Sequence, residues 1–219
     1  MIQPIDARQS APATQRNREP ILAILQQVLP PHGTVLEISS GTGEHAVFFA
    51  PRLAPRLWIP SDPNPIARSS IAAWSDHCPA DNLYPPIALD VREPVWTIEQ
   101  AERPQNLQEL DLQQNPITAI VNINMIHISP WSACLGLMAG AERILSVDGI
   151  LYLYGPFKQN GQHNAPSNAA FDESLQAQNP EWGVRNLEDV VAIARSHGLS
   201  RFRTYPMPAN NLSVVFQRQ

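Results

Sequence analysis

A chain of 219 residues, of which 43% are hydrophobic and 16% are charged, has the length and composition of one globular domain with a full core. Its net charge of −5 and its lack of a Lys/Arg cluster argue against a nucleic-acid partner bound through a basic face. No apolar stretch approaches the roughly 18–20 residues of a membrane span, and residues 1–6 do not resemble a secretory signal, so we expect no membrane association.

The two cysteines and the uninterrupted chain indicate a simple organisation. Cys78 and Cys134 lie far apart in the sequence and lack the spacing of metal ligands, so we expect reduced thiols, no metal site and a cytoplasmic location. No repeat, low-complexity tract or linker-like boundary interrupts the chain. We therefore expect a single domain over residues 1–219, with residues 1–14 as a loose arm.

The first half of the chain alternates amphipathic segments with short apolar runs. Ile21, Leu22 and Leu25 recur at helical spacing, and the prolines at 30 and 31 end that helix. In chain order we expect a helix over 15–29, a strand over 34–38, a helix over 43–54, a strand over 57–59, a helix over 65–77, a strand over 87–89 and a helical turn over 107–112.

The second half begins with a continuous apolar run over 117–123, which is typical of a central strand buried on both faces. In chain order we expect that strand, a helix over 131–145, a strand over 150–154, a mobile polar loop over 155–168, helices over 168–178 and 186–196, and strands over 202–206 and 212–216.

This alternation predicts an α/β fold, a Rossmann-like, doubly wound sheet of about seven strands that are mostly parallel. The connection between the last two strands is shorter than the dozen or so residues of a parallel crossover, so these strands form an antiparallel C-terminal pair. Five strand–helix units followed by such a pair is the order of class I methyltransferases.

The segment Glu37–Gly43 reads Glu-Ile-Ser-Ser-Gly-Thr-Gly and is the most informative stretch of the chain. Gly41 and Gly43 can adopt positive φ and allow backbone N–H groups to approach a ligand closely. Glu37 would repel a phosphate but suits the sulfonium and ammonium groups of S-adenosylmethionine. The pattern is similar to the first methyltransferase motif, with Ser39 at the position of the first glycine.

The same turn also matches the dinucleotide fingerprint G-x-G-x-x-A through Gly41, Gly43 and Ala46. Asp62 lies 19 residues after Gly43, near the spacing of a ribose-binding carboxylate. A nicotinamide enzyme is therefore an alternative. Glu37, the helix before the first strand and the antiparallel terminal pair favour the adenosyl cofactor.

Carboxylates follow the second and third expected strands, at the edge where open α/β sheets bind ligands. Asp62 can accept hydrogen bonds from both ribose hydroxyls, and its alternative role is a helix cap in the Asp-Pro-Asn-Pro turn. Asp90, next to Val91, can accept from an adenine amino group, or it is a solvated turn residue. We assign all three residues to the cofactor site.

The segment after the fourth parallel strand contains polar residues that would lie beside the reacting methyl group. We place Asn122 with the cofactor, Asn124 at the acceptor atom and His127 as a candidate general base. His127 is alternatively a buried structural residue. Trp131 either forms a wall of the acceptor pocket or packs in the core.

Two further segments are candidate covers for the acceptor. Arg16 and Asn17 precede the first helix, and Arg16 can reach an acidic substrate if that helix closes over the site. Phe157 and Lys158 lie in the loop that leaves the fifth strand at the same edge of the sheet. Their alternative roles are a solvated helix start and a surface loop.

Several segments together resemble the uncharacterised, methyltransferase-like domain-of-unknown-function family 938. The resemblance covers nearly the whole chain and rests on residues 15–22, 39–45, 60–62, 89–91, 124–131, 154–157, 168–175 and 182–185. Asn186 stands where that pattern has Asp. The resemblance implies the class I methyltransferase fold and S-adenosylmethionine binding, and it implies no substrate.

We therefore expect a methyltransferase that uses S-adenosylmethionine and acts on a small-molecule acceptor. The alternative from another class is a non-catalytic protein that kept the fold and binds an adenosyl ligand or a partner. A nicotinamide-dependent oxidoreductase is the third hypothesis.

Overall fold

The computed structural model describes residues 6–100, 104, 107–108 and 110–219. The helices are α1 Pro12–Val28, α2 Glu44–Phe49, η1 Ala50–Arg52, α3 Pro65–His77, η2 Thr97–Glu99, η4 Met125–His127, α4 Trp131–Ile144, α5 Pro166–Gln178, α6 Leu187–Ser196 and η5 Pro208–Asn210. The strands are β1 Thr34–Ile38, β2 Leu57–Ser61, β3 Ile117–Ile123, β4 Ile150–Gly155, β5 Phe157–Gln159, β6 Gln162–His163, β7 Arg185–Asn186, β8 Leu199–Met207 and β9 Asn211–Arg218. No helix in this described part of the chain is long and apolar enough to cross a membrane. The expected helical turn over 107–112 falls partly outside the described residues.

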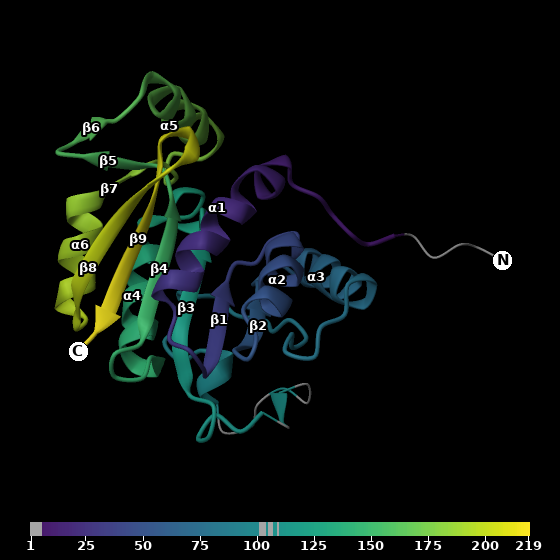
Figure 1. The fold of residues 1–219 in the computed structure, drawn as a ribbon. Coiled ribbons are helices and arrows are strands. Elements are labelled where there is room, and N and C mark those ends of the chain that lie inside the picture. The colour runs from purple at the N-terminus through teal and green to yellow at the C-terminus, as the bar shows by residue number, and fades with distance from the viewer. Residues whose placement is uncertain (1–5, 101–103, 105–106, 109) are drawn as a thin grey trace.

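The main sheet has six strands in the order β2-β1-β3-β4-β9-β8 (Figure 1). The first four are parallel, and β9 runs antiparallel between β4 and β8. This confirms the predicted fold class, a mostly parallel α/β sheet with an antiparallel C-terminal pair. Ile38 of β1 pairs with Asn122 of β3, so both strands end at one edge of the sheet.

Helices cover both faces of this sheet, as expected for parallel strands with apolar residues on both sides. Side chains alternate along each strand, so Val35 of β1 packs with α1 and α2, whereas Leu36 and Ile38 pack with α4 and α6. Both clusters consist of almost fully buried apolar side chains. The helical layers on the two faces hold the parallel strands in place, and they thereby position the site at the strand ends.

The expected third strand over 87–89 is wrong. Beyond β2, only two isolated bridges form, between Trp58 and Leu83 and between Ser61 and Ile87. Prolines 85 and 86 lack N–H donors and prevent a continuous ladder in this segment. The segment still lies along the outer side of β2, because the amide of Ile87 donates to the carbonyl of Pro60 and its carbonyl accepts from Asp62.

The expected loop over 155–168 is not irregular. It contains β5 and β6, which with β7 form a second sheet in the order β6-β5-β7. We call residues 157–186, which comprise β5, β6, α5 and β7, the cap. The cap lies beyond the end of the main sheet, above the carboxyl ends of β3 and β4 (Figure 1). Strands of two or three polar residues have too little alternation to be recognised in the sequence.

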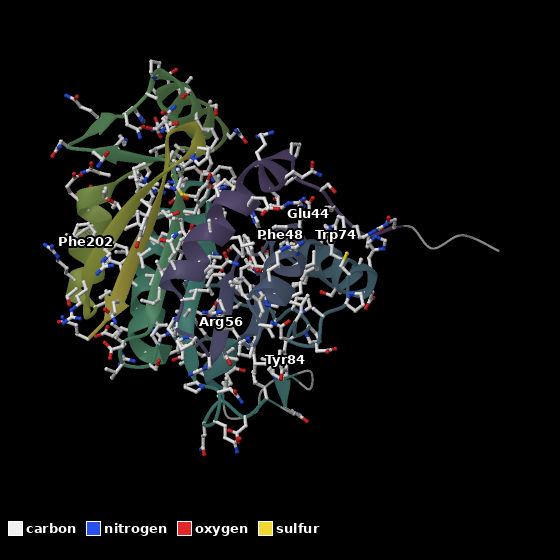
Figure 2. The ribbon with its side chains drawn as sticks, viewed as in Figure 1. Glu44, Phe48, Arg56, Trp74, Tyr84 and Phe202 are labelled. Carbon is white, nitrogen blue, oxygen red and sulfur yellow. The ribbon has the colours of Figure 1, made fainter. Side chains whose placement is uncertain are left out.

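The arm is packed, not loose, over its described residues. The amide of Gln9 donates to Ser70 Oγ (2.8 Å), and the indole of Trp74 donates to the carbonyl of Gln9 (2.7 Å). The amide of Ala11 donates to Glu44 Oε2 (2.6 Å), and α1 begins at Pro12. In Figure 2 the labelled side chains of Glu44 and Trp74 lie where the arm reaches α2 and α3. Main-chain hydrogen bonds hold this segment, and they leave no apolar pattern in the sequence.

Candidate cofactor and acceptor site

The carboxyl ends of the parallel strands open into two cavities. The glycine-loop cavity has a volume of about 210 Å³, and its lining includes Ser39, Leu89, Asp90, Val91, Met125 and Ile128. The amide-lined cavity has a volume of about 500 Å³, and its lining includes Arg16, Asn17, Asn124, Ile128, Tyr154, Asn168, Phe171 and Asn211. Ile128 lines both cavities, so they are neighbours.

The turn after β1 has the left-handed backbone that its glycines suggest. Gly41 has a φ of 56° and Gly43 a φ of 89°. A Cβ atom on Gly43 would lie 2.7 Å from the Cα of Ile71, whereas one on Gly41 would meet no described atom within 4 Å. Ser39 also has a positive φ, 55°, and keeps the turn at a position where glycine adopts this conformation without strain.

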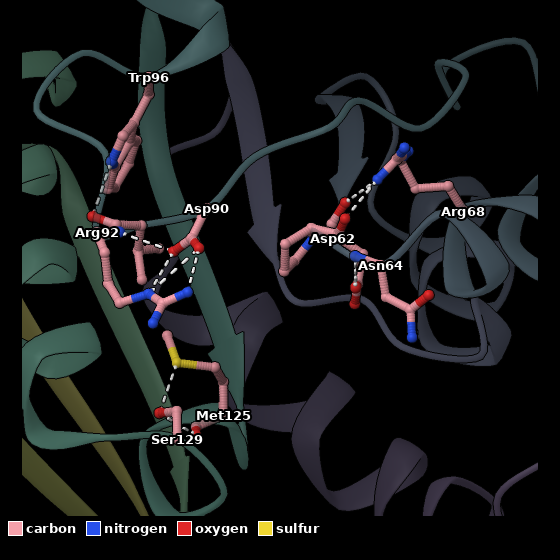
Figure 3. Close-up of polar contacts among 10 residues, drawn as sticks. Asp62, Asn64, Arg68, Asp90, Arg92, Trp96, Met125 and Ser129 are labelled. Atoms are coloured by element: carbon pink, nitrogen blue, oxygen red, sulfur yellow. Dashed lines mark hydrogen bonds and ion pairs between the residues drawn. The ribbon is translucent and has the colours of Figure 1, made fainter.

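Asp62 joins the turn after β1 to the turn after β2, and Figure 3 shows it beside Asn64 and Arg68. Its Oδ2 accepts from the amide of Gly41 (3.1 Å) and its Oδ1 from the amide of Asn64 (2.9 Å). Burial, which leaves the residue 6% exposed, raises the pKa of the carboxyl, and these two hydrogen bonds partly oppose the shift. Asn64, not Asp62, caps α3 by accepting from the amide of Ile66. The capping role considered for Asp62 is therefore wrong.

Asp90 and Val91 lie in the glycine-loop cavity beside Ser39. The Arg92 guanidinium pairs with Asp90 (2.6 Å) and lowers the pKa of that carboxyl (Figure 3). Leu89 and Met125 make part of the lining apolar. The cavity thus combines apolar side chains with a carboxylate that is paired with Arg92.

Glu37 is buried among apolar groups and lines neither cavity. It is 2% exposed, and its Oε2 accepts from the indole Nε1 of Trp58 (2.9 Å). Burial raises the pKa of the carboxyl to about 7, so its charge is incomplete at neutral pH. Glu37 lies on the α1–α2 side of the sheet with Trp58.

Asn122 lies on the opposite side, at the end of β3. Its Nδ2 donates to the carbonyl of Ile38 (3.1 Å) and ties β1 to β3. Its Oδ1 is buried and has no hydrogen-bond partner among the described residues. A buried acceptor at a strand end is an expected contact for a polar ligand group.

His127 is 1% exposed and lines neither cavity. Its ring packs edge-on against Phe157, with 5.2 Å between ring centroids, and neither ring nitrogen has a hydrogen-bond partner among the described residues. Burial, followed by the charge of Arg185, lowers the pKa of the imidazole to about 3. A base of this strength inside the core matches the structural alternative considered for His127.

The other candidate cover residues are divided between the cavity and the packed interior. Phe157, the first residue of the cap, is buried in the core, and the Lys158 ammonium pairs with Asp172 (3.3 Å). Trp131 packs against the core, and Arg185 lies over its ring. None of these three candidates lines either cavity, whereas Arg16, Asn17 and Asn124 line the amide-lined cavity as expected.

The sequence analysis did not identify Tyr154, Asn168 or Asn211 as site residues. Burial raises the pKa of the Tyr154 hydroxyl, and hydrogen bonds from Asn17 and Asn211 partly oppose the shift. Tyr154 lies at the end of the fifth expected strand. This is the edge of the sheet at which the sequence analysis placed Asp62. The two asparagines come from α5 and β9, and no sequence spacing connects them with Tyr154.

The fold is that of the class I methyltransferases. Three solved structures are similar: an O-methyltransferase family protein from Burkholderia thailandensis (TM-score 0.71, 12% identity), the mitomycin 7-O-methyltransferase MmcR (0.72, 12%) and human N-acetylserotonin methyltransferase in complex with S-adenosylmethionine (0.65, 11%). Each match covers 94% of this chain but only 57%, 54% and 58% of the respective structure. The chain thus spans little more than half the length of these proteins, and at such identities the likeness shows the fold.

The family is shown by a second comparison. The model of the family described as "protein of unknown function (DUF938)" matches residues 8–218. The chain belongs to this family, as its segments around the glycine loop, β3 and the cap indicated.

Proposed function

We propose that the protein is a methyltransferase that uses S-adenosylmethionine and acts on a small-molecule acceptor. The observation that supports this most directly is the adjacency of the two cavities at the strand ends, with Ile128 between them. A cofactor in the glycine-loop cavity would have its reacting end next to the larger cavity. Two neighbouring cavities suit a transfer between two bound molecules.

The residues at the glycine loop fit this cofactor. Val91 and Met125 offer apolar contacts for an adenine ring, and Asp62 keeps acceptor capacity for ribose hydroxyls beyond its two backbone bonds. The Oδ1 of Asn122 has no partner among the described residues, but it is buried at the end of β3 and Asn122 lines neither cavity. S-adenosylmethionine supplies an activated methyl group on its sulfonium, and the protein need only align the acceptor and exclude water.

Calorimetric titration with S-adenosylmethionine, S-adenosylhomocysteine and NAD tests this proposal. We expect both adenosyl ligands to bind and NAD not to bind. Asp62→Asn removes a charged hydrogen-bond acceptor and should weaken adenosyl binding by about 1–3 kcal/mol. Asp81→Asn changes an exposed carboxylate away from both cavities and should have no effect.

Two outcomes would contradict the proposal, and a third would contradict the role of Asp62. Binding of NAD alone would favour the oxidoreductase. Absence of binding by all three ligands would favour a non-catalytic role. Equal affinities for Asp62→Asn and the unchanged protein would remove Asp62 from the site.

A further inference from the structure

We infer that the methyl acceptor is a carboxylate, held by the Tyr154 hydroxyl and the Arg16 guanidinium, and that the product is a methyl ester. This inference rests on the proposed function and specifies the substrate class of the amide-lined cavity. Three features of the cavity carry it: a hydroxyl prepared to donate, a cation without a counter-ion, and the kind of ionisable groups present.

Tyr154 is arranged as a hydrogen-bond donor to the cavity. Hydrogen bonds from Asn17 and Asn211 oppose the rise in the pKa of its hydroxyl, as expected when both carboxamides donate to the oxygen. The Oδ1 of Asn17 contacts His45 Nε2 (2.8 Å), which directs the Asn17 amide nitrogen elsewhere. Tyr154 lines the cavity and burial raises the pKa of its hydroxyl, so the protonated O–H can donate to an acceptor there.

Arg16 supplies the charge. Its side chain is exposed at the cavity and makes no hydrogen bond or ion pair with any described residue. Among the described lining residues there is no carboxylate, so the cavity has a formal positive charge. A guanidinium recognises a carboxylate through paired N–H donors, and this pairing is stronger than a neutral hydrogen bond.

The ionisable groups at the cavity favour an acceptor that is already a nucleophile. Burial raises the pKa of Tyr154, and His127 lies outside the cavity with a pKa of about 3, so neither supplies a base to the cavity at neutral pH. A carboxylic acid has a pKa near 4 and is ionised without a base. A carboxylate oxygen forms the new O–CH₃ bond as the S–CH₃ bond breaks, the bonding pair stays on sulfur, and no proton moves.

The remainder of the lining suggests the body of the substrate. Phe171, Pro156 and Pro208 contribute apolar surface to the same cavity. A volume of about 500 Å³ is within the usual range for small-molecule sites. The expected ligand is therefore a small monocarboxylic acid with an apolar or aromatic body.

A binding experiment that needs no turnover tests the recognition. Ligand-observed NMR would compare a panel of aromatic and aliphatic carboxylates, including phenylacetate, with the matched amides and alcohols. We expect carboxylates alone to bind, with affinity reduced about tenfold in Arg16→Gln and Tyr154→Phe. Arg201→Gln and Tyr205→Phe make the same changes on β8, outside this cavity, and should leave binding intact.

A transfer assay with methyl-labelled S-adenosylmethionine tests the chemistry. We expect label that alkali releases as methanol, at a rate nearly constant from about pH 6 to pH 9 because the acceptor is ionised throughout. The inference would be overturned if the label were stable to alkali, if acids and amides bound equally, or if no carboxylate bound. Failure of the proposed function itself is distinguishable, because the unchanged protein would then not bind S-adenosylhomocysteine.

Discussion

Gly41 and Gly43 share a left-handed backbone but have different surroundings, and this difference predicts different effects of alanine. Gly41→Ala incurs mainly the backbone cost of about 1–2 kcal/mol, because its Cβ meets no described atom within 4 Å. Gly43→Ala adds a collision with the Ile71 backbone at 2.7 Å, so we expect a loss of about 3 kcal/mol or more. Urea denaturation measures both values.

The effect of the two substitutions on ligand affinity should have the opposite order, with the larger loss in Gly41→Ala. The methyl group of Gly41→Ala enters the open space beside the glycine loop, so S-adenosylhomocysteine affinity should fall more than stability does. Equal losses of stability in the two variants would contradict the different surroundings of the two glycines.

Single residues show why part of the site was predictable. The positive φ of the glycines and the position of Asp62 follow from local patterns, because a strand–turn–helix sequence requires them. The environment of His127 does not, because its burial depends on Phe157 and on a cap formed from distant residues. Tyr154 was missed because its role depends on Asn17 and Asn211, which come from opposite ends of the chain.

Among the elements, the cap is held together by one buried carboxylate. Asp172 accepts from the amide of Val184 (2.7 Å), from Lys158 Nζ (3.3 Å) and from Gln176 Nε2 (3.1 Å), and it lies 3.2 Å from His163 Nε2. Burial would raise the pKa of this carboxyl, but these contacts lower it overall. Asp172 therefore connects α5 to β5 and to the segment that leads into β7.

Asp172→Asn should loosen the cap without disturbing the glycine loop. The amide keeps the size of the side chain but loses its charge and faces several donors, so we expect a loss of about 1–3 kcal/mol. Amide hydrogen exchange should quicken in α5, which carries Asn168 and Phe171 of the amide-lined cavity. S-adenosylhomocysteine affinity should change little, because the cap contributes Trp182 to the lining of the glycine-loop cavity and the other lining residues lie outside the cap.

The control for this variant is Glu173→Gln, at the next, exposed position of α5. It should leave exchange in the cap unchanged. Equal exchange in Asp172→Asn and Glu173→Gln would show that the carboxylate of Asp172 does not hold the cap.

The elements that the sequence predicted correctly have long apolar patterns. The strand over 117–123 and the helix over 65–77 have the predicted bounds because their periodicity and their proline or turn residues agree. The strand expected over 87–89 was wrong and the cap strands were missed, for opposite reasons. The apolar triplet follows two prolines without N–H donors and forms only an isolated bridge, whereas short, mostly polar strands formed through tertiary contacts.

For the whole molecule, buried ionisable groups act on stability in opposite directions. Burial lowers the pKa of His45 to about 4 and of His127 to about 3, so the unfolded chain binds more protons below its histidine pKa of 6.5. These residues contribute stability that is lost as the pH falls below about 6.5. Glu37, with a folded pKa of about 7 against 4.5, binds its proton more tightly in the folded state, and its contribution is lost as the pH rises from 4.5 to 7.

The two histidines together outweigh Glu37 between pH 4.5 and pH 6.5, so stability should rise to about pH 7 and then level off, and Glu37→Gln should make this rise steeper. The carboxamide of this variant can still accept from the Trp58 indole but does not titrate, so the opposing contribution of the carboxyl should disappear. The free energy of unfolding of the variant relative to the unchanged protein should rise by about 3 kcal/mol between pH 4.5 and pH 7, at about 1.4 kcal/mol per pKa unit. Urea denaturation across this range measures the difference, and Glu173→Gln should show none of this rise because its side chain is exposed in α5. A difference that stays constant with pH would mean that Glu37 does not hold a proton in the folded protein at neutral pH.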